Sequence, residues 1–205
     1  MTAVGGGAVG GDSVTLSSND FQLFGVPVRF AQDAVSLDAR WKQLQREAHP
    51  DKFASSDDAS QRLAMQWSVR INEAYRRLRN PLQRAAYLCE LAGVPVNAEN
   101  NTAMPSDFLM QQMEWREQLD AAADASAVEA LHRQVAGSRE RTLQRCEELL
   151  DRRHDTIEAV AQVRALMFIE RFNSDIERRL EQLETDLPLE PTGTRSRATD
   201  ASASG

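Results

Sequence analysis

The sequence predicts an all-α protein, and two observations carry that prediction. Residues that favour helices, above all Ala, Leu, Glu, Gln and Arg, are abundant, whereas aromatic residues make up only 6% of the chain. Apolar residues recur at helical steps of three and four through most of the sequence, and no stretch shows the alternation typical of a β-strand. We therefore expect two helical modules, the second of them a three-helix bundle.

The first module is expected over residues 19–93, after a glycine-rich flexible tail of residues 1–18. Its four helices begin or end at residues typical of helix caps and breaks: Asn19 or Asp20, Gly25 with Pro27, Asp33 or Ser36, Asn80 with Pro81, and Gly93. The third helix is expected at about Ser60–Arg79. Because the second and third helices each carry one apolar stripe, they are predicted to form an antiparallel hairpin.

The second module is expected over residues 106–186, after a linker of residues 94–105 that contains two prolines, three asparagines and no helical period. Its three helices are expected at about Ser106–Ala122, Ser126–Arg153 and Asp155–Glu184. Short connections between long helices predict an antiparallel bundle. Residues 187–205 have the composition of a disordered tail.

The two modules differ in charge, although the chain as a whole carries a net charge of −7. Residues 18–92 contain 11 Lys and Arg against 9 Asp and Glu, whereas residues 106–186 contain 11 Arg against 18 acids. This asymmetry indicates modules that face different partners, with a solvated acidic surface as the alternative. The acidic total speaks against general binding to nucleic acid or to a membrane surface. Without a signal peptide or a membrane-spanning apolar run, we expect a cytoplasmic protein.

The residue types that carry catalysis or bind metals are sparse and scattered. Cys89 and Cys146 belong to no CxxC motif or Cys/His cluster, so we expect two buried, reduced thiols and no metal site. The three histidines, His49, His132 and His154, are dispersed, and no GxxxxGK[ST] phosphate-binding motif occurs. We therefore expect no catalytic residue, no cofactor and no enzyme activity.

A His49-Pro50-Asp51 triplet follows the amphipathic second helix. Proline stops that helix and pushes His49 towards solvent, and Asp51 is expected to fix the turn by binding backbone N–H groups. Lys42 and Arg46 lie one turn apart on a basic face of the same helix. From these residues alone, a helix-ending turn and a solvated charged face remain the alternatives to a binding site.

The helix expected at Ser106–Ala122 carries two apolar stripes on a helical wheel. Those suited to the bundle core are Phe108, Trp115 and Leu119. Those on the far side are Leu109, Met110 and Met113, bordered by Glu114 and Glu117. An apolar patch with charged edges often marks a protein-binding surface, and packing against the fourth helix or the linker is the alternative. Phe168 lies at the edge of the core stripe of the last helix and suits either the core or the patch.

In combination these motifs resemble a known family. The FxLFG helix, the HPDKF sequence and INEAYRRLRNPLQRAAYL look like a J domain, the module that stimulates ATP hydrolysis by DnaK-type chaperones. LFGVPVRF, PLQRAAYL and DFLMQQMEWREQLD extend the resemblance to the HscB family of iron–sulfur cluster co-chaperones. It covers about Asp20–Leu183, and the absence of an N-terminal cysteine-rich zinc module points to the bacterial type.

The resemblance implies an L-shaped protein whose J domain recruits an HscA- or DnaK-type ATPase and whose bundle binds an IscU-type scaffold. The residues it places on the ATPase-stimulating face are His49, Pro50, Asp51, Lys42 and Arg46. Those it places on the scaffold-binding patch are Leu109, Met110, Met113, Glu114, Glu117 and Phe168. Ala48 departs from the Tyr of many J domains, so one aromatic contact is missing or supplied elsewhere. A J-domain co-chaperone for another client, and a helical adaptor without a chaperone link, are the alternatives.

Overall fold

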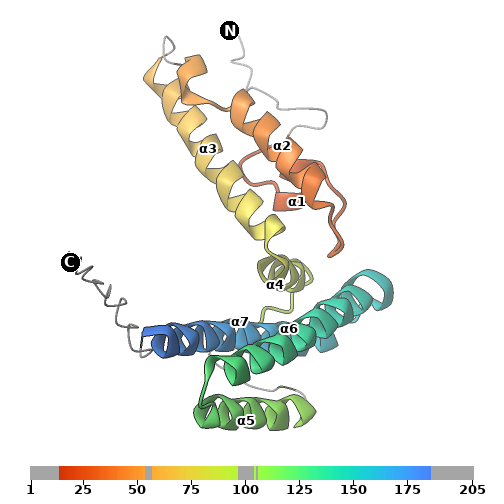
Figure 1. Ribbon diagram of the computed structural model, residues 1–205. Coiled ribbons are helices and arrows are strands. Elements are labelled where there is room, and N and C mark those ends of the chain that lie inside the picture. Colours follow the sequence, from red (N-terminus) through yellow and green to blue (C-terminus); the bar gives the residue numbers. More distant parts are fainter. Residues whose placement is uncertain (1–13, 54–56, 97–103, 105, 186–205) are drawn as a thin grey trace, which may run out of the picture.

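The computed structural model describes residues 14–53, 57–96, 104 and 106–185, and it confirms the all-α prediction (Figure 1). The elements are α1 (Asp20–Phe24), α2 (Ala34–Glu47), the 3₁₀ turn η1 (Pro50–Phe53), α3 (Asp58–Arg79), α4 (Pro81–Leu91), α5 (Ser106–Ala121), α6 (Ala125–Glu147), the π-helical segment η2 (Glu148–Arg153) and α7 (Thr156–Thr185). No described helix is long and apolar enough to cross a bilayer. Most of the expected tails and linker (1–13, 97–103, 105 and 186–205) lies outside the described residues.

A buried carboxylate anchors α1 to α3 in the N-terminal arm, which comprises α1 to α4. Asn19 caps α1 with a capping box, and Gly25 ends it with a φ of 63°. Asp20, fully buried, forms ion pairs with Arg70 at 2.6 Å and with Arg77 at 2.9 Å. Removing one partner of a buried ion pair costs about 3–5 kcal/mol, so this cluster fixes where α1 lies.

The antiparallel pairing of α2 and α3 forms the long part of the N-terminal arm. Leu37 and Leu44 of α2 are buried, as are Ile71 and Leu78 of α3. The ring of Trp41 stacks on that of Tyr75 with centroids 4.8 Å apart. This hairpin presents the η1 turn at its tip, away from the bundle (Figure 1).

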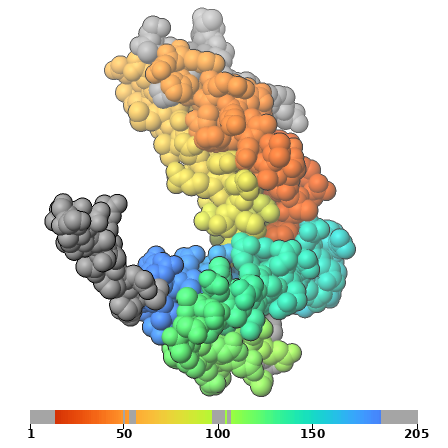
Figure 2. Space-filling view, in the orientation of Figure 1, coloured from red at the N-terminus to blue at the C-terminus, as the bar shows by residue number. Residues whose placement is uncertain are grey.

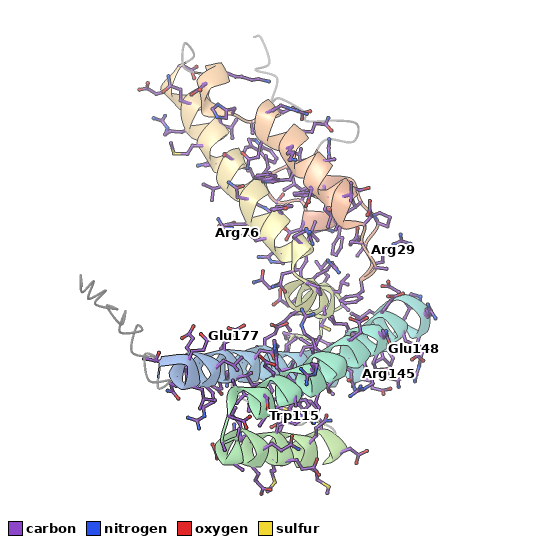
Figure 3. All side chains as sticks on the ribbon, viewed as in Figure 1. Arg29, Arg76, Trp115, Arg145, Glu148 and Glu177 are labelled. Carbon is purple, nitrogen blue, oxygen red and sulfur yellow. The ribbon has the colours of Figure 1, made fainter. Side chains whose placement is uncertain are left out.

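Helix α5 joins the α6–α7 pair mainly through aromatic rings. Trp115, 2% exposed, stacks on Phe172 with centroids 5.8 Å apart, and Figure 3 shows it between α5 and the other two helices. The edge of Phe108 packs against Trp115 at 6.1 Å. The aliphatic part of this core consists of Ala122, Val128, Leu131, Val135, Ile169 and Ile176. The expected three-helix bundle is therefore present.

The two arms share one hydrophobic core where α4 meets the first half of α7 (Figure 1). Its buried members include Ala85, Leu88 and Cys89 of α4, Cys146 of α6, Leu149 of η2, and Val160, Val163 and Leu166 of α7. The predicted buried thiols are confirmed. Burial raises the pKa of Cys89 to about 11 and that of Cys146 to about 12, and the nearby Cys89 also raises the latter.

The expectation of one α-helix over Ser126–Arg153 is wrong at its C-terminal end, where η2 is π-helical. The widened turn is closed by a hydrogen bond from the Asp155 N–H to the Leu149 carbonyl oxygen at 2.9 Å, and His154 ends it in the left-handed conformation with a φ of 54°. Asp151 in this segment faces the loop after α1. That loop sits against the end of α6 in Figure 2.

Candidate partner-binding sites

The His49-Pro50-Asp51 triplet forms an exposed turn at the tip of the hairpin. The side chain of His49 is 54% exposed and that of Asp51 is 90% exposed. The Lys52 N–H donates to the His49 carbonyl oxygen at 3.0 Å and closes the turn. The prediction that His49 points to solvent is thus confirmed.

Asp51 orients the imidazole of His49 instead of capping backbone groups as expected. Its N–H donates to His49 Nδ1 at 3.3 Å, and its Oδ2 lies 3.5 Å from the same atom. No bond from a backbone N–H to this carboxylate is present among the described residues. Both contacts are made by Nδ1 and hold this side of the ring against Asp51. The other ring nitrogen, Nε2, has no partner in the described part of the chain and remains for another molecule.

A basic face lies on α2 just before the triplet. Lys42 and Arg46 are both exposed, and neither forms an ion pair with any residue that the structure describes. They border a groove of about 460 Å³ that Trp41, Gln45 and Asn72 also line. This groove was not predicted, because it depends on how α3 lies against α2. Two exposed cations beside it, of which Lys42 also interacts electrostatically with Asp38, are suited to an acidic partner surface.

Ala48, where many J domains have Tyr, is only 7% exposed and packs in the core of the N-terminal arm. This position therefore adds no ring to the surface around the triplet. Trp41 is the half-buried aromatic residue on the same side of α2 as the basic face.

The outward stripe of α5 is exposed, as the helical wheel indicated. Leu109 is 44% exposed, and Met110 and Met113 are each 65% exposed. Glu114 and Glu117 beside them are exposed as well. The alternative that this stripe packs against the fourth helix is wrong, because the three side chains are exposed. Most of the linker, the other partner considered, lies outside the described residues.

Phe168 is half-buried and belongs mainly to the ring cluster under α5. Its ring stacks on that of Phe172 and meets that of Phe108 edge-on, with both centroid distances 5.8 Å. The guanidinium of Arg116 lies 5.6 Å above its centroid. Phe168 thus supports the patch from below, whereas the exposed surface is formed by the three α5 residues.

Comparison with known proteins places both arms in one family. Residues 104–177 match a family model described as the HSCB C-terminal oligomerisation domain. A co-chaperone protein HscB homolog of Burkholderia multivorans is 50% identical over 175 residues, which cover 84% of this chain and 99% of that protein. A Burkholderia cenocepacia homolog of the same name matches equally well.

Solved structures of two relatives share the fold. The chaperone HscB from Vibrio cholerae is 34% identical with a TM-score of 0.71, and the match covers 81% of this chain and 99% of that one. The human co-chaperone protein HscB is 24% identical with a TM-score of 0.74, and the match covers 84% of each chain. At that identity the human protein supports the fold alone.

Proposed function

This chain belongs to the HscB family, the J-domain co-chaperones of iron–sulfur cluster assembly, and on that premise we propose that it delivers an IscU-type scaffold protein to a DnaK- or HscA-type ATPase. The N-terminal arm contacts the ATPase, and its His49-Pro50-Asp51 triplet stimulates ATP hydrolysis there. The bundle holds the scaffold, whose cluster is the cargo. The chemistry takes place in the partner's active site.

The exposed triplet and the basic face beside it support the ATPase contact. The imidazole of His49 is oriented by Asp51 and offers Nε2 to a partner. Lys42 and Arg46, both exposed, can pair with an acidic lobe, and such pairing sets orientation and raises the association rate. By binding the hydrolysis-competent conformation more tightly than other conformations, the arm shifts the ATPase towards it.

The observation that carries the scaffold contact is the exposure of Leu109, Met110 and Met113 on a helix whose opposite side is buried through Trp115. These apolar side chains are not buried within the molecule, so removing their surface from water by binding a partner is favourable. Methionine side chains adapt to the shape of a bound protein. The acidic bundle also favours a partner with basic residues around its apolar contact.

The shared core supports coupling between the two contacts. Because α4 and α7 are packed together, the arms hold the ATPase and the scaffold at one relative geometry. Binding both partners at once raises the effective concentration of scaffold at the ATPase. Stimulation of ATP hydrolysis is then coupled to delivery of the scaffold.

The His49→Gln variant tests this function, with His132→Gln on the exposed surface of α6 as the matched control. We expect His49→Gln to abolish stimulation of the ATPase and to leave scaffold affinity within about twofold. The assay uses HscA-type and DnaK-type ATPases, each with and without scaffold. Undiminished stimulation by His49→Gln would show the assignment to be wrong, and binding of neither scaffold nor ATPase would favour the helical adaptor.

A further inference from the structure

A groove runs along α5 on the side that faces α6, next to the exposed patch. Met110, Gln111 and Glu114 line one wall, and Ser138 and Arg141 of α6 line the other. Its volume is about 620 Å³, within the range of roughly 300–1,000 Å³ that binding pockets usually have. The patch and the groove therefore meet along one edge of α5.

The groove is open because α6 presents small side chains there. Ser138 and Thr142 are 5% and 8% exposed, and the Thr142 hydroxyl donates to the Ser138 carbonyl oxygen at 2.8 Å within its own helix. A hydrogen bond from Ser138 Oγ to Gln111 Oε1 crosses the groove at 3.3 Å, which is long for two oxygens. Trp115 meanwhile fixes α5 through the ring cluster. A partner can thus enter without displacing α5.

The charges at the rim of the groove have opposite signs on opposite walls. Glu114 and Arg141 are both exposed, and neither forms an ion pair with a described residue. An extended polypeptide offers N–H donors and C=O acceptors along its two edges. Glu114 accepts from such donors, and Arg141 donates to such acceptors. The ring of Phe108, which also lines the groove, offers contact for an apolar side chain.

The hollow on the opposite side of α5, facing α7, is lined by Arg116 and Asp120 of α5 and by charged residues of α7. It measures about 580 Å³ and contains Arg178 and Arg179. Arg178 pairs with Asp175 at 3.2 Å, and Arg179 donates to the Ala122 carbonyl oxygen at 3.1 Å. These groups already stabilise the end of the bundle. The two sides of α5 therefore differ, because the cations on the α7 wall are already bonded within the bundle, whereas Arg141 on the α6 wall forms no ion pair with a described residue.

We propose that the groove between α5 and α6 binds an extended polypeptide segment of the scaffold partner. Met110 and Glu114 belong to both the patch and the groove, so a protein seated on the patch lies directly over the opening. The segment contributes backbone groups to Glu114 and Arg141 and a small apolar side chain to the floor. This inference rests on the proposed function and extends the scaffold-binding surface from α5 to α6.

The test measures the affinity of the full chain for an IscU-type scaffold by isothermal titration calorimetry. Arg141→Glu reverses the charge on the α6 wall, and Ser138→Phe fills the groove. Each is expected to weaken binding about tenfold. Arg178→Glu makes the same charge reversal on the other side of α5 and is expected to change affinity by less than about twofold. Met113→Ala alters the patch but not the groove.

The combination of variants separates this inference from the proposed function. If Met113→Ala weakens binding but Arg141→Glu and Ser138→Phe do not, the groove assignment is wrong and the patch assignment stands. If none of the three weakens binding, the proposed function fails as well. Since Ser138 is buried, thermal unfolding of each variant is recorded, and Arg141→Glu at the exposed rim decides the result if Ser138→Phe does not fold. If Arg141→Glu and Ser138→Phe changed only the molar mass of the chain without scaffold and left scaffold affinity unchanged, the groove would bind a second copy of this chain. That result would overturn the inference.

Discussion

Asp151 Oδ1 lies 2.6 Å from the backbone nitrogen of Phe30, and this hydrogen bond joins the bundle to the N-terminal arm. The other carboxylate oxygen accepts from the Ala31 N–H at 2.8 Å. Burial lowers the pKa of the Arg84 guanidinium, whereas the charge of Asp151 raises it. One half-buried carboxylate therefore satisfies two backbone donors and offsets a buried cation where the arms meet.

Asp151→Ala is expected to lower the free energy of unfolding by about 2–3 kcal/mol, because two N–H groups and Arg84 lose their acceptor and counter-charge. Chemical denaturation with urea measures the change. The control is Glu147→Gln, which removes an exposed ion pair with Arg152 at 3.7 Å and is expected to cost less than about 0.5 kcal/mol. Equal effects of the two substitutions would contradict the role given to Asp151.

Asp38 and Tyr75 link α2 to α3 through a hydrogen bond whose strength depends on pH. Tyr75 Oη donates to Asp38 Oδ1 at 2.8 Å, and Arg79 Nε donates to the same oxygen at 3.1 Å. The hydrogen bond from Tyr75 is the main cause that lowers the pKa of Asp38; burial opposes it, and Arg79 adds to it. The same bond and burial raise the pKa of Tyr75.

The stabilisation from this pair is expected to persist between the two pKa values and to fade outside them. The Asp38 contribution is present above its ordinary pKa of 3.8 and is lost as pH falls through the lowered value. The Tyr75 contribution is present below 10.0 and is lost as pH rises through the raised value. Asp38→Asn should therefore differ most from wild type at neutral pH, as measured by urea denaturation across pH.

Asp124 provides the control for that experiment. The Ala127 N–H donates to its carboxylate and lowers its pKa, but no tyrosine is involved. Asp124→Asn should consequently alter the pH dependence of the unfolding free energy at low pH and leave it unchanged at high pH. If Asp124→Asn changed the dependence of unfolding free energy on pH at high pH, or if Asp38→Asn did not, the assignment of the high-pH loss of stability to Tyr75 would be contradicted.

The two thiols are expected to be unreactive in the native protein. Both are fully buried, and a pKa of about 11 leaves Cys89 about one part in a thousand thiolate at pH 8. Labelling with Ellman's reagent should therefore follow global unfolding. An Ala136→Cys variant places a thiol on the exposed side of α6 and should react at once. Similar rates for native and introduced thiols would show that the shared core opens readily.

Helix caps and apolar periods were the parts of the fold that the sequence predicted well. Asn80 caps α4 as expected, and Asn19 and Asp33, each one of two candidates, cap α1 and α2. An N-cap acts within three residues of itself, so its signal is local. The wheel also separated the exposed Met113 from the buried Trp115, since both positions depend on one helix alone. Local signals of this kind need no knowledge of the neighbouring helix.

The packing of the two arms against each other could not be predicted from those local signals. Val135 and Cys146 are both buried residues of α6, yet Val135 packs in the bundle core and Cys146 in the core shared with α4. A period shows which face is buried but not which helix buries it. The π-helical turn around Asp151 was missed for a similar reason, because ELLDRR is an ordinary helical sequence and the turn is seen only in the packed structure. The grooves beside α2 and α5 likewise depend on helix pairs.

The patch and its support should respond differently to truncation. Replacing Leu109, Met110 and Met113 together by Ala is expected to change the free energy of unfolding by less than about 1 kcal/mol, since these side chains are exposed. Phe168→Ala removes a ring that touches Phe172 and should cost about 2–3 kcal/mol, below the range for a fully buried Phe. Urea denaturation gives both values.

Scaffold affinity then distinguishes contact from support. The triple variant should weaken scaffold binding strongly while its fold is intact, because it removes the exposed apolar surface itself. Phe168→Ala should weaken scaffold binding less than the triple variant, because its ring mainly holds Phe108 and α5 in place. Both affinities are measured at a temperature well below the unfolding midpoint of each variant. If Phe168→Ala instead abolished binding with little loss of stability, Phe168 would be a direct contact and the patch would extend from α5 onto α7.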